Sequence, residues 1–294
     1  MNALASTPAD TRTVILKAAS TLGVLHGGTQ GAQRLLALLC DPNVGAGQVA
    51  DALSREPALA LRVLRVANSA FYGASRNIST IGRAVALLGQ DAVRGIAAAA
   101  CLDRTVRQAD AAQPVDLDQL VQHGFATAVA AESLARLGHG ALAADAFIAG
   151  LLHDLGIAVQ IGIDRGGAQA LIEALRSDPA AAIADLEGQR TQIGHAQCAA
   201  VLFEAWQLPA ALVAVARWHH EPLDAPAAHR ELASLVHLGD QLALACGSHH
   251  ALEPAAPTRN AAVMAQLGLE DADLDGVAAT LPERVSQLRD AFAA

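Results

Sequence analysis

Histidine and aspartate side chains recur along the second half of this chain, and their types and order suit metal-dependent chemistry. His153 and Asp154 are adjacent in the apolar segment FIAGLLHDLGIAV, and the pair His219-His220 ends the segment AALVAVARWHH. Imidazoles and carboxylates are the ligands that hold iron, manganese or zinc at hydrolytic sites with one or two metals. The candidate metal ligands, in chain order, are His123, His153, Asp154, His195, His219, His220 and Asp240.

The spacing of these residues predicts a site built from several helices. An adjacent His-Asp pair at a helix end can reach one metal while the carboxylate bridges to a second. A lone histidine in an alanine-rich helix is usually a hydrogen-bonded core residue, so no single member is specific. The ordered set in apolar segments, where buried polar groups need partners, favours the metal site. The other histidines are interpreted as loop or surface residues: His26, His139, His229, His237, His249 and His250.

The composition indicates that helices must position these residues. Hydrophobic residues make up 53% of the chain, but much of that share is alanine, and aromatic residues are only 3%. Such a sequence favours helices over sheets. No strand-like alternation of useful length is present, so we predict an all-α fold, a bundle of many helices.

Local signals place the helix ends. In the first half, Asp41-Pro42 ends a leucine-rich helix, Pro57 suits a first helical position, and Ser79 and Gly89 are expected to begin and end another helix. Residues 1–27 are weakly patterned, and the polar stretch from Asp110 to Pro114 is the best internal boundary. In the second half, helices are predicted near residues 116–137, 141–155, 167–176, 190–205, 209–219 and 229–245.

The charge is unevenly distributed. The chain carries a formal net charge of −9, which weighs against generic nucleic-acid binding, although residues 55–107 carry a local +5. A basic segment on an acidic protein predicts an anionic ligand or an acidic partner, and a solvated face explains it about equally well. The candidate partner-contact residues in this segment are Arg65, Asn68, Tyr72, Arg76 and Arg83.

Two other interpretations of the basic segment stay open. Asn68 could cap the end of its helix and fix the loop that follows, without contacting a partner. The stretch STIGRAVALLGQDAVRGIAAA has the length and turn glycine of a helix-turn-helix. The acidic charge of the whole chain argues against sequence-specific DNA binding.

The cysteines and the N-terminal sequence predict a cytoplasmic protein. The cysteines have no CxxC spacing, which suits reduced, buried thiols better than disulfides or a zinc site. No uncharged apolar run approaches the roughly 18 residues of a membrane span, and the start MNALASTPADTRTVILK lacks a signal-peptide pattern. We expect no membrane partner. The four cysteines are Cys40, Cys101, Cys198 and Cys246.

The ordered ligand set is similar to that of the HD superfamily of metal-dependent phosphohydrolases, especially its HD-GYP branch. The upstream half resembles the opening of an HDOD domain, an HD-related output domain of bacterial signalling proteins. The segments GLLHDLG (150–156) and GHAQCAAVLFEAWQLPAALVAVARWHH (194–220) continue the match, which spans roughly residues 30–245. The upstream anchors are Pro57, Leu64, Asn68, Ser69, Tyr72, Gly73, Ile78, Ala84, Leu88 and Gly89.

The resemblance implies an HDOD domain over residues 28–246. An N-terminal helical subdomain (28–112) would pack on an HD-like subdomain (113–246), with a segment 1–27 before them and a helical tail 247–294 after them. It also implies a bacterial signal-transduction module that acts through contacts with a signalling protein. One or two transition metal ions, Fe, Mn or Zn, would occupy its HD-type pocket.

The chain departs from active HD-GYP enzymes in ways that predict little or no catalysis. No GYP tripeptide follows the paired histidines, and Ile157 replaces the lysine that commonly follows the HD-x-G pattern. A cation beside the metals would stabilise charge in the transition state. Gln119 stands where trinuclear relatives have a carboxylate, so we expect two metals at most. We assign no catalytic residue; the alternative is a metal-dependent phosphohydrolase acting on a nucleotide or cyclic dinucleotide.

Overall fold

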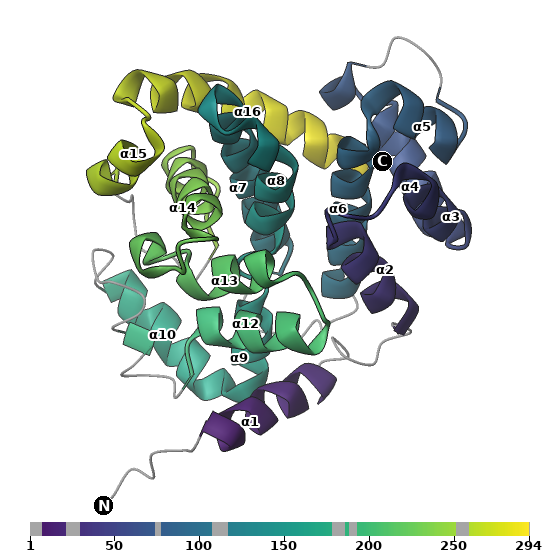
Figure 1. Ribbon diagram of the computed structural model, residues 1–294. Coiled ribbons are helices and arrows are strands. Elements are labelled where there is room, and N and C mark those ends of the chain that lie inside the picture. The colour runs from purple at the N-terminus through teal and green to yellow at the C-terminus, as the bar shows by residue number, and fades with distance from the viewer. Residues whose placement is uncertain are drawn as a thin grey trace, which may run out of the picture.

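The chain folds into a multi-helix assembly (Figure 1). The computed structural model describes residues 8–21, 30–73, 78–107, 117–177, 186–187, 193–250 and 259–293. Within these ranges the regular secondary structure is helical and no strand occurs, which confirms the predicted all-α class. The expected boundary at residues 110–114 lies outside the described residues, so the division into domains stays a prediction.

The first half consists of short helices around one long helix. Pro57 opens its helix as expected, and Gly89 ends another with φ 87°. The cap of that second helix is Thr80 rather than Ser79, because the extended backbone at Thr80 lets its hydroxyl accept from the N–H of Arg83. The helices are α2 (Gln30–Cys40), α3 (Ala46–Ser54), α4 (Pro57–Ala67), the 3-10 turn η1 (Ala70–Tyr72), α5 (Ile81–Leu88) and α6 (Gln90–Arg107).

The second half carries the predicted ligands. The helix expected near 141–155 is shorter than predicted, because the turn 153–155 separates two helices and Gly156 begins the second. The helices are α7 (Leu117–Gly138), η2 (Gly140–Leu142), α8 (Ala143–Leu152), α9 (Gly156–Ile163), α10 (Arg165–Ser177), α12 (His195–Ala205), α13 (Ala210–Trp218), η3 (Pro222–Asp224), α14 (Arg230–Ala245), α15 (Ala261–Leu267) and α16 (Asp271–Ala293).

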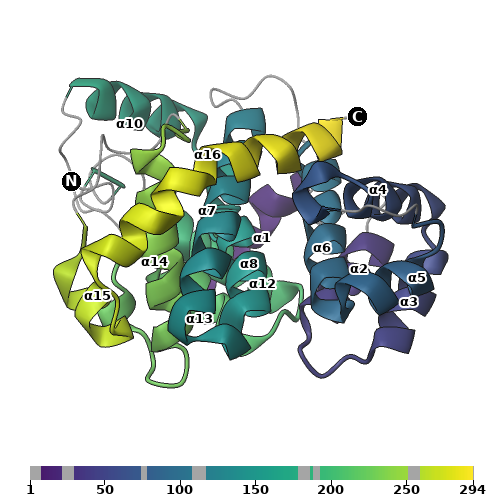
Figure 2. The same cartoon turned by 90° about the horizontal axis from the view of Figure 1, so that it is seen from above.

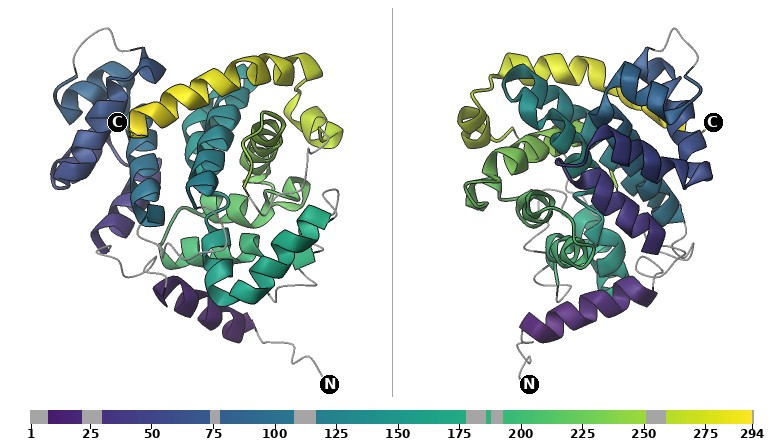
Figure 3. Two further views of the ribbon diagram at one scale, coloured as in Figure 1. Left: turned by 180° about the vertical axis from the view of Figure 1, so that it is seen from behind. Right: turned by 45° about the vertical axis from the view of Figure 1, so that its right-hand side comes forward.

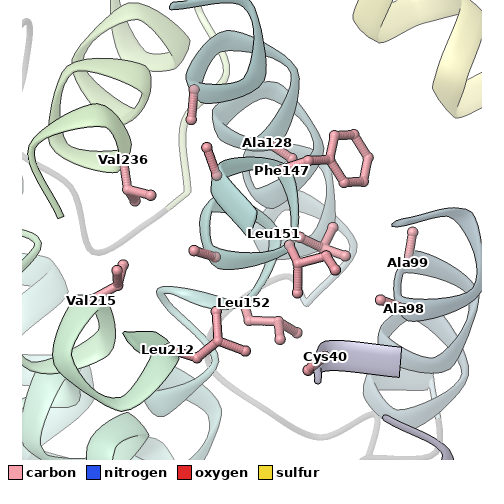
Figure 4. Packing of buried hydrophobic residues seen from close by; sticks show 14 of the residues in the cluster. Cys40, Ala98, Ala99, Ala128, Phe147, Leu151, Leu152, Leu212, Val215 and Val236 are labelled. Atoms are coloured by element: carbon pink, nitrogen blue, oxygen red, sulfur yellow. The ribbon is translucent and has the colours of Figure 1, made fainter. Parts of the chain in front are cut away.

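One apolar core joins the two halves around α8. Figure 4 shows Cys40 of α2 and Ala98 of α6 on one side of Leu151, with Leu212 and Val236 on the other. Burial of apolar side chains is the main source of stability here. Cys40 and Cys198 are buried, as predicted for the cysteines, and Cys246 is half-buried. The core thus fixes α8, and with it the turn that carries the His-Asp pair.

The weakly patterned N-terminal segment contains a helix, α1 (Pro8–Thr21). It packs against α9 and α12 (Figure 3) and buries Ile15 and Ala19 completely. The weak sequence pattern of residues 1–27 thus includes a helix over residues 8–21 that the sequence analysis did not predict. The helix is stabilised by this tertiary contact more than by its own amphipathic pattern.

The helix α16 crosses from the second half to the first (Figure 2). It packs against α7, and its far end packs against α4 and η1. The rings of Phe125 and Phe292 lie 5.1 Å apart, and the guanidinium of Arg62 in α4 lies 5.9 Å from the Phe292 ring. Near its middle, the guanidinium of Arg284 lies 5.4 Å from the ring of Phe71. The helix α16 thus contacts both halves.

One helical stretch of the described residues, Gly140–Ile163, is long and apolar enough to cross a membrane. Its most apolar window is 89% buried inside the protein. Core helices of water-soluble folds pass the same test of length and composition. The stretch is compatible with the predicted cytoplasmic location, which stays a prediction.

Candidate metal centre

The structure brings all seven predicted ligands together in one cluster. His123 comes from α7, His195 begins α12, and Asp240 comes from α14. The pair His153-Asp154 forms the turn after α8, and the paired histidines follow α13. All are buried except His220, which is half-buried. Polar side chains from residues more than a hundred positions apart along the chain therefore meet in one buried cluster.

Glycines next to the ligands let the helices approach closely. A Cβ atom at Gly124, beside His123, would lie 2.8 Å from the carbonyl oxygen of Leu151 in α8. A Cβ atom at Gly239, beside Asp240, would lie 2.8 Å from the backbone nitrogen of Ala131 in α7. Only glycine permits such backbone contact. The helices α7, α8 and α14 thus lie close enough for the candidate ligands that they carry to meet in one cluster.

Asp154 lies at the middle of the cluster, with one group of imidazoles at each carboxylate oxygen. Its Oδ1 atom is 3.3 Å from His219 Nε2 and 3.5 Å from His195 Nε2. Its Oδ2 atom is 3.1 Å from His153 Nε2 and 3.0 Å from His250 Nε2. This arrangement corresponds to the bridging role predicted for the aspartate of the pair.

Three overlapping groups of candidate ligands lie at and around this carboxylate. On the Oδ1 side, His220 Nε2 lies 2.9 Å from His195 Nε2. On the other side, His123 Nε2 lies 3.1 Å from Asp240 Oδ1. The potential ligand atoms within each group lie within 4.8 Å of one another. The groups are Asp154-His195-His219-His220, His123-His153-Asp240 and His123-Asp154-His250.

The hydrogen bonds of the imidazoles fit metal ligation. The Nδ1 atoms of His123, His153 and His219 donate to the carbonyl oxygens of Ser248, Gly150 and Ala216, at 2.9, 2.7 and 3.0 Å. A carbonyl only accepts, so Nδ1 carries a proton in each ring and Nε2 is the atom directed at the carboxylates. A cation between an Nε2 atom and a carboxylate oxygen would have a candidate ligand on each side.

Buried atoms without hydrogen-bond partners lead to the same conclusion. Within the described part of the chain, His153 Nε2, Asp154 Oδ1 and Asp240 Oδ1 are buried and lack a hydrogen-bond partner. Native proteins rarely leave such groups unsatisfied. A metal ion supplies what these three atoms lack, so the residues present fit one or two bound metals.

The carboxylates of the cluster are ionised. Burial by itself would raise the pKa of Asp154, but the surrounding imidazoles, His153 foremost, hold it well below its usual range. Burial acts on the pKa of Asp240 in the same direction, and His123 outweighs it there. Burial lowers the pKa of His219, which keeps that ring neutral. Glu187 counteracts burial and raises the pKa of His195. Two buried negative charges require compensating positive charge, which protonated imidazoles or a bound cation can supply.

Glu187 orients one of the ligands, although no sequence pattern pointed to it. It is buried, and its Oε1 atom accepts from His195 Nδ1 at 2.7 Å, from the His195 backbone N–H at 3.0 Å and from Gln160 Nε2 at 2.7 Å. A carboxylate in this position fixes the tautomer and direction of a ligating imidazole. Glu187 is therefore a positioning residue for His195.

Two of these histidines are buried: the expected loop or surface location is wrong for His237, and His250 lies in a loop but is not at the surface. His250 is only 4% exposed and reaches Asp154, and His237 is buried in α14, where its Nδ1 atom donates to the His219 carbonyl at 2.7 Å. His249 is exposed as expected, His139 and His229 are half-buried, and His26 lies outside the described residues.

The structure does not gather the partner-contact candidates on one exposed face. Asn68 is occupied internally, since its side chain donates to the carbonyls of Leu64 and Ile78 and accepts from the Ile78 N–H at 2.7 Å. That geometry is the structural alternative stated for this residue. Arg65 and Arg83 are exposed on α4 and α5, and Arg76 lies outside the described residues.

Tyr72 is less exposed than Arg65 and Arg83. Its ring is half-buried, and burial raises the pKa of its hydroxyl. It lines a cavity of about 400 Å³ between the two halves, together with Glu132 and Arg136 of α7 and Phe147 of α8. Tyr72 therefore faces an internal junction more than an outer surface.

Comparison with known proteins identifies the family. The HDOD domain model matches residues 29–222, so the chain belongs to the HDOD family. An uncharacterized protein of Treponema pallidum (strain Nichols) is 28% identical over 210 residues. That alignment covers 67% of this chain and 37% of that protein, so the chain spans little more than a third of this relative's length.

Solved structures share the fold over nearly the whole chain. A protein of Marinobacter aquaeolei VT8, described as a signal transduction protein, matches with a TM-score of 0.74 and 25% identity, covering 98% of this chain and 67% of that one. An HDOD domain protein of unknown function from Geobacter sulfurreducens matches with a TM-score of 0.71 and 23% identity, covering 97% and 98%. The chain is thus an HD-related helical module with a His/Asp cluster that could bind metal.

Proposed function

We propose that the chain is a bacterial signal-transduction module that acts through protein contacts, with one or two transition metal ions, Fe, Mn or Zn, in its HD-type centre and little or no catalysis. The observation that carries this proposal is that the protein encloses the cluster and shields it from solvent. Among the predicted ligands only His220 is more than slightly exposed. Structural metal sites are closed by protein ligands, whereas catalytic sites keep an open position for water or substrate.

The surroundings of the cluster also favour a role without phosphate chemistry. In the described part of the chain, the ion pairs of Asp154 and Asp240 involve histidines alone. Ile157 is completely buried in a small apolar cluster with Leu120 and Leu171. Among the described residues, no Lys or Arg pairs with these carboxylates to stabilise a phosphoryl transition state. When bound, the metal would neutralise the buried carboxylates and cross-link α7, α8, α12, α13 and α14.

A second function stays open, a metal-dependent phosphohydrolase acting on a nucleotide or cyclic dinucleotide. The observation that favours it is the position of Asp154 between two groups of imidazoles. Two-metal hydrolytic sites use such a bridge to hold both ions against a phosphate. The two functions differ in turnover, and both require the metal.

We expect the purified protein to carry one or two transition metals per chain and to hydrolyse nucleotides and cyclic dinucleotides much more slowly than about 1 per second, the low end of ordinary turnover. The measurements are elemental analysis of untagged protein and a hydrolysis screen after loading with iron, manganese or zinc. Well under one metal per chain after reconstitution would refute the metal centre. Turnover near ordinary rates would replace the leading function with the second.

The basic segment offers a test of protein contact. Reversing Arg65 and Arg83 together to Glu is expected to abolish the signalling phenotype of the host, because long-range attraction to an acidic partner becomes repulsion. Circular dichroism and metal content should not change, since both side chains are exposed. Arg176→Glu, at an exposed position of α10, is the matched control. Normal signalling by the double variant would show that the basic segment is only a solvated face.

A further inference from the structure

A short segment after α14 contacts the metal centre at two points. The carbonyl oxygen of Ser248 accepts from His123 Nδ1 at 2.9 Å, and His250 Nε2 lies 3.0 Å from Asp154 Oδ2. This segment lies beyond residue 222, where the match to the family model ends. Ser248 and His250, like the predicted ligand Asp240, thus lie outside the matched range.

The end of α14 explains how the chain turns back to the centre. Gly247 has φ 85°, in the left-handed region that ends many helices, and Ser248 N–H donates to the carbonyl of Ala243 at 3.0 Å. The next two side chains then face opposite ways, because His249 is exposed and His250 is 4% exposed. The turn thus buries one of two adjacent histidines.

The buried imidazole is placed as a ligand would be. Its ring lies edge-on to that of His123, with centroids 5.1 Å apart. Its potential ligand atom lies within 4.8 Å of those of His123 and Asp154, so the three residues form a group able to hold one ion. This group contacts Asp154 through Oδ2 and shares His123 with the group His123-His153-Asp240.

We propose that His250 is a ligand of the metal on the Oδ2 side of Asp154, together with His123, His153 and Asp240. The inference rests on the proposed metal centre and adds one ligand from outside the family's matched region. With five protein ligands, an octahedral ion at this position keeps at most one place for water. The segment 248–250 then closes the second position, and its attachment depends on bound metal.

The test compares two neighbouring histidines. His250→Ala and the matched control His249→Ala are titrated with Co²⁺ and with Mn²⁺, and affinities are measured by competition with a chelator. We expect His250→Ala to lose at least about tenfold in affinity for one of the two ions, since even changes around a ligand cost about 10–100-fold. The visible spectrum of the cobalt-loaded protein should change in this variant and not in the control.

A second readout follows the segment itself. In the wild type, removing metal should increase proteolytic cleavage after α14, whereas His250→Ala should be cleaved equally with and without metal. His250→Gln serves if the alanine variant unfolds, because an amide can still bond to Asp154 without ligating like an imidazole. Equal affinity and spectra for the His250 and His249 variants would overturn this assignment alone. A wild type that binds no metal would overturn the proposed function as well.

Discussion

Asp154→Asn is expected to abolish metal loading at both positions, with losses in affinity greater than about 100-fold, beyond the usual effect of changes around a ligand. The reason is that each oxygen of this one carboxylate faces a different group of imidazoles. An amide offers one neutral oxygen and a nitrogen that ligates poorly. Metal content per chain and chelator competition measure the effect.

The same substitution should destabilise the metal-free protein at neutral pH. The imidazoles around Asp154 hold its pKa well below the usual range, so the ionised carboxylate stabilises the fold and a neutral amide loses that contribution. Asp224→Asn, at an exposed position, is the control for both measurements. If Asp154→Asn loads metal like the control, Asp154 is not the bridge between the two positions.

Gly156→Ala is expected to destabilise the fold by at least about 3 kcal/mol, the upper end of ordinary overpacking. A Cβ atom at this position would lie 2.0 Å from the carbonyl oxygen of His195 and 2.6 Å from the backbone nitrogen of Ala199. Backbone atoms cannot rotate away as a side chain can. The helices α9 and α12 would have to separate, and α12 begins with a ligand.

Urea unfolding of the metal-free protein measures this effect without interference from metal binding. The matched control is Gly276→Ala in α16, where a Cβ atom would meet nothing within 4 Å. That control should stabilise the protein by about 0.5–1 kcal/mol, because alanine favours an exposed helix interior over glycine. Equal midpoints for both variants would mean that α9 and α12 pack less closely than described.

Much of the fold and most of the cluster could be predicted from the sequence, because the signals lie in residues that are close together along the chain. Helix-favouring composition and turn residues such as Pro57 and Gly89 act within a few positions of the chain. The helices of the first half could therefore be predicted from the sequence. The order of the histidines and aspartates, repeated in apolar segments, was enough to select seven residues that the structure brings together.

The errors have a common physical origin in tertiary contact. His250 and Glu187 lie in segments without periodic pattern, and only the fold brings them to Asp154 and His195. The helix α1 has little amphipathic pattern of its own and depends on α9 and α12. Asn68 could be interpreted as a surface residue because the carbonyl of Ile78, ten positions later, is not a neighbour in the sequence.

The path of α16 has a consequence for the order in which the protein assembles during synthesis. Arg62 donates to the carbonyl oxygen of Phe292, a contact that spans 230 positions of the chain. The early helices therefore leave the ribosome long before the helix that covers them. Contacts of such long range form late and slowly, because a large loop must close first. Until α16 arrives, the surfaces of α4 and η1 that it covers stay exposed on the nascent chain, where chaperones could bind them.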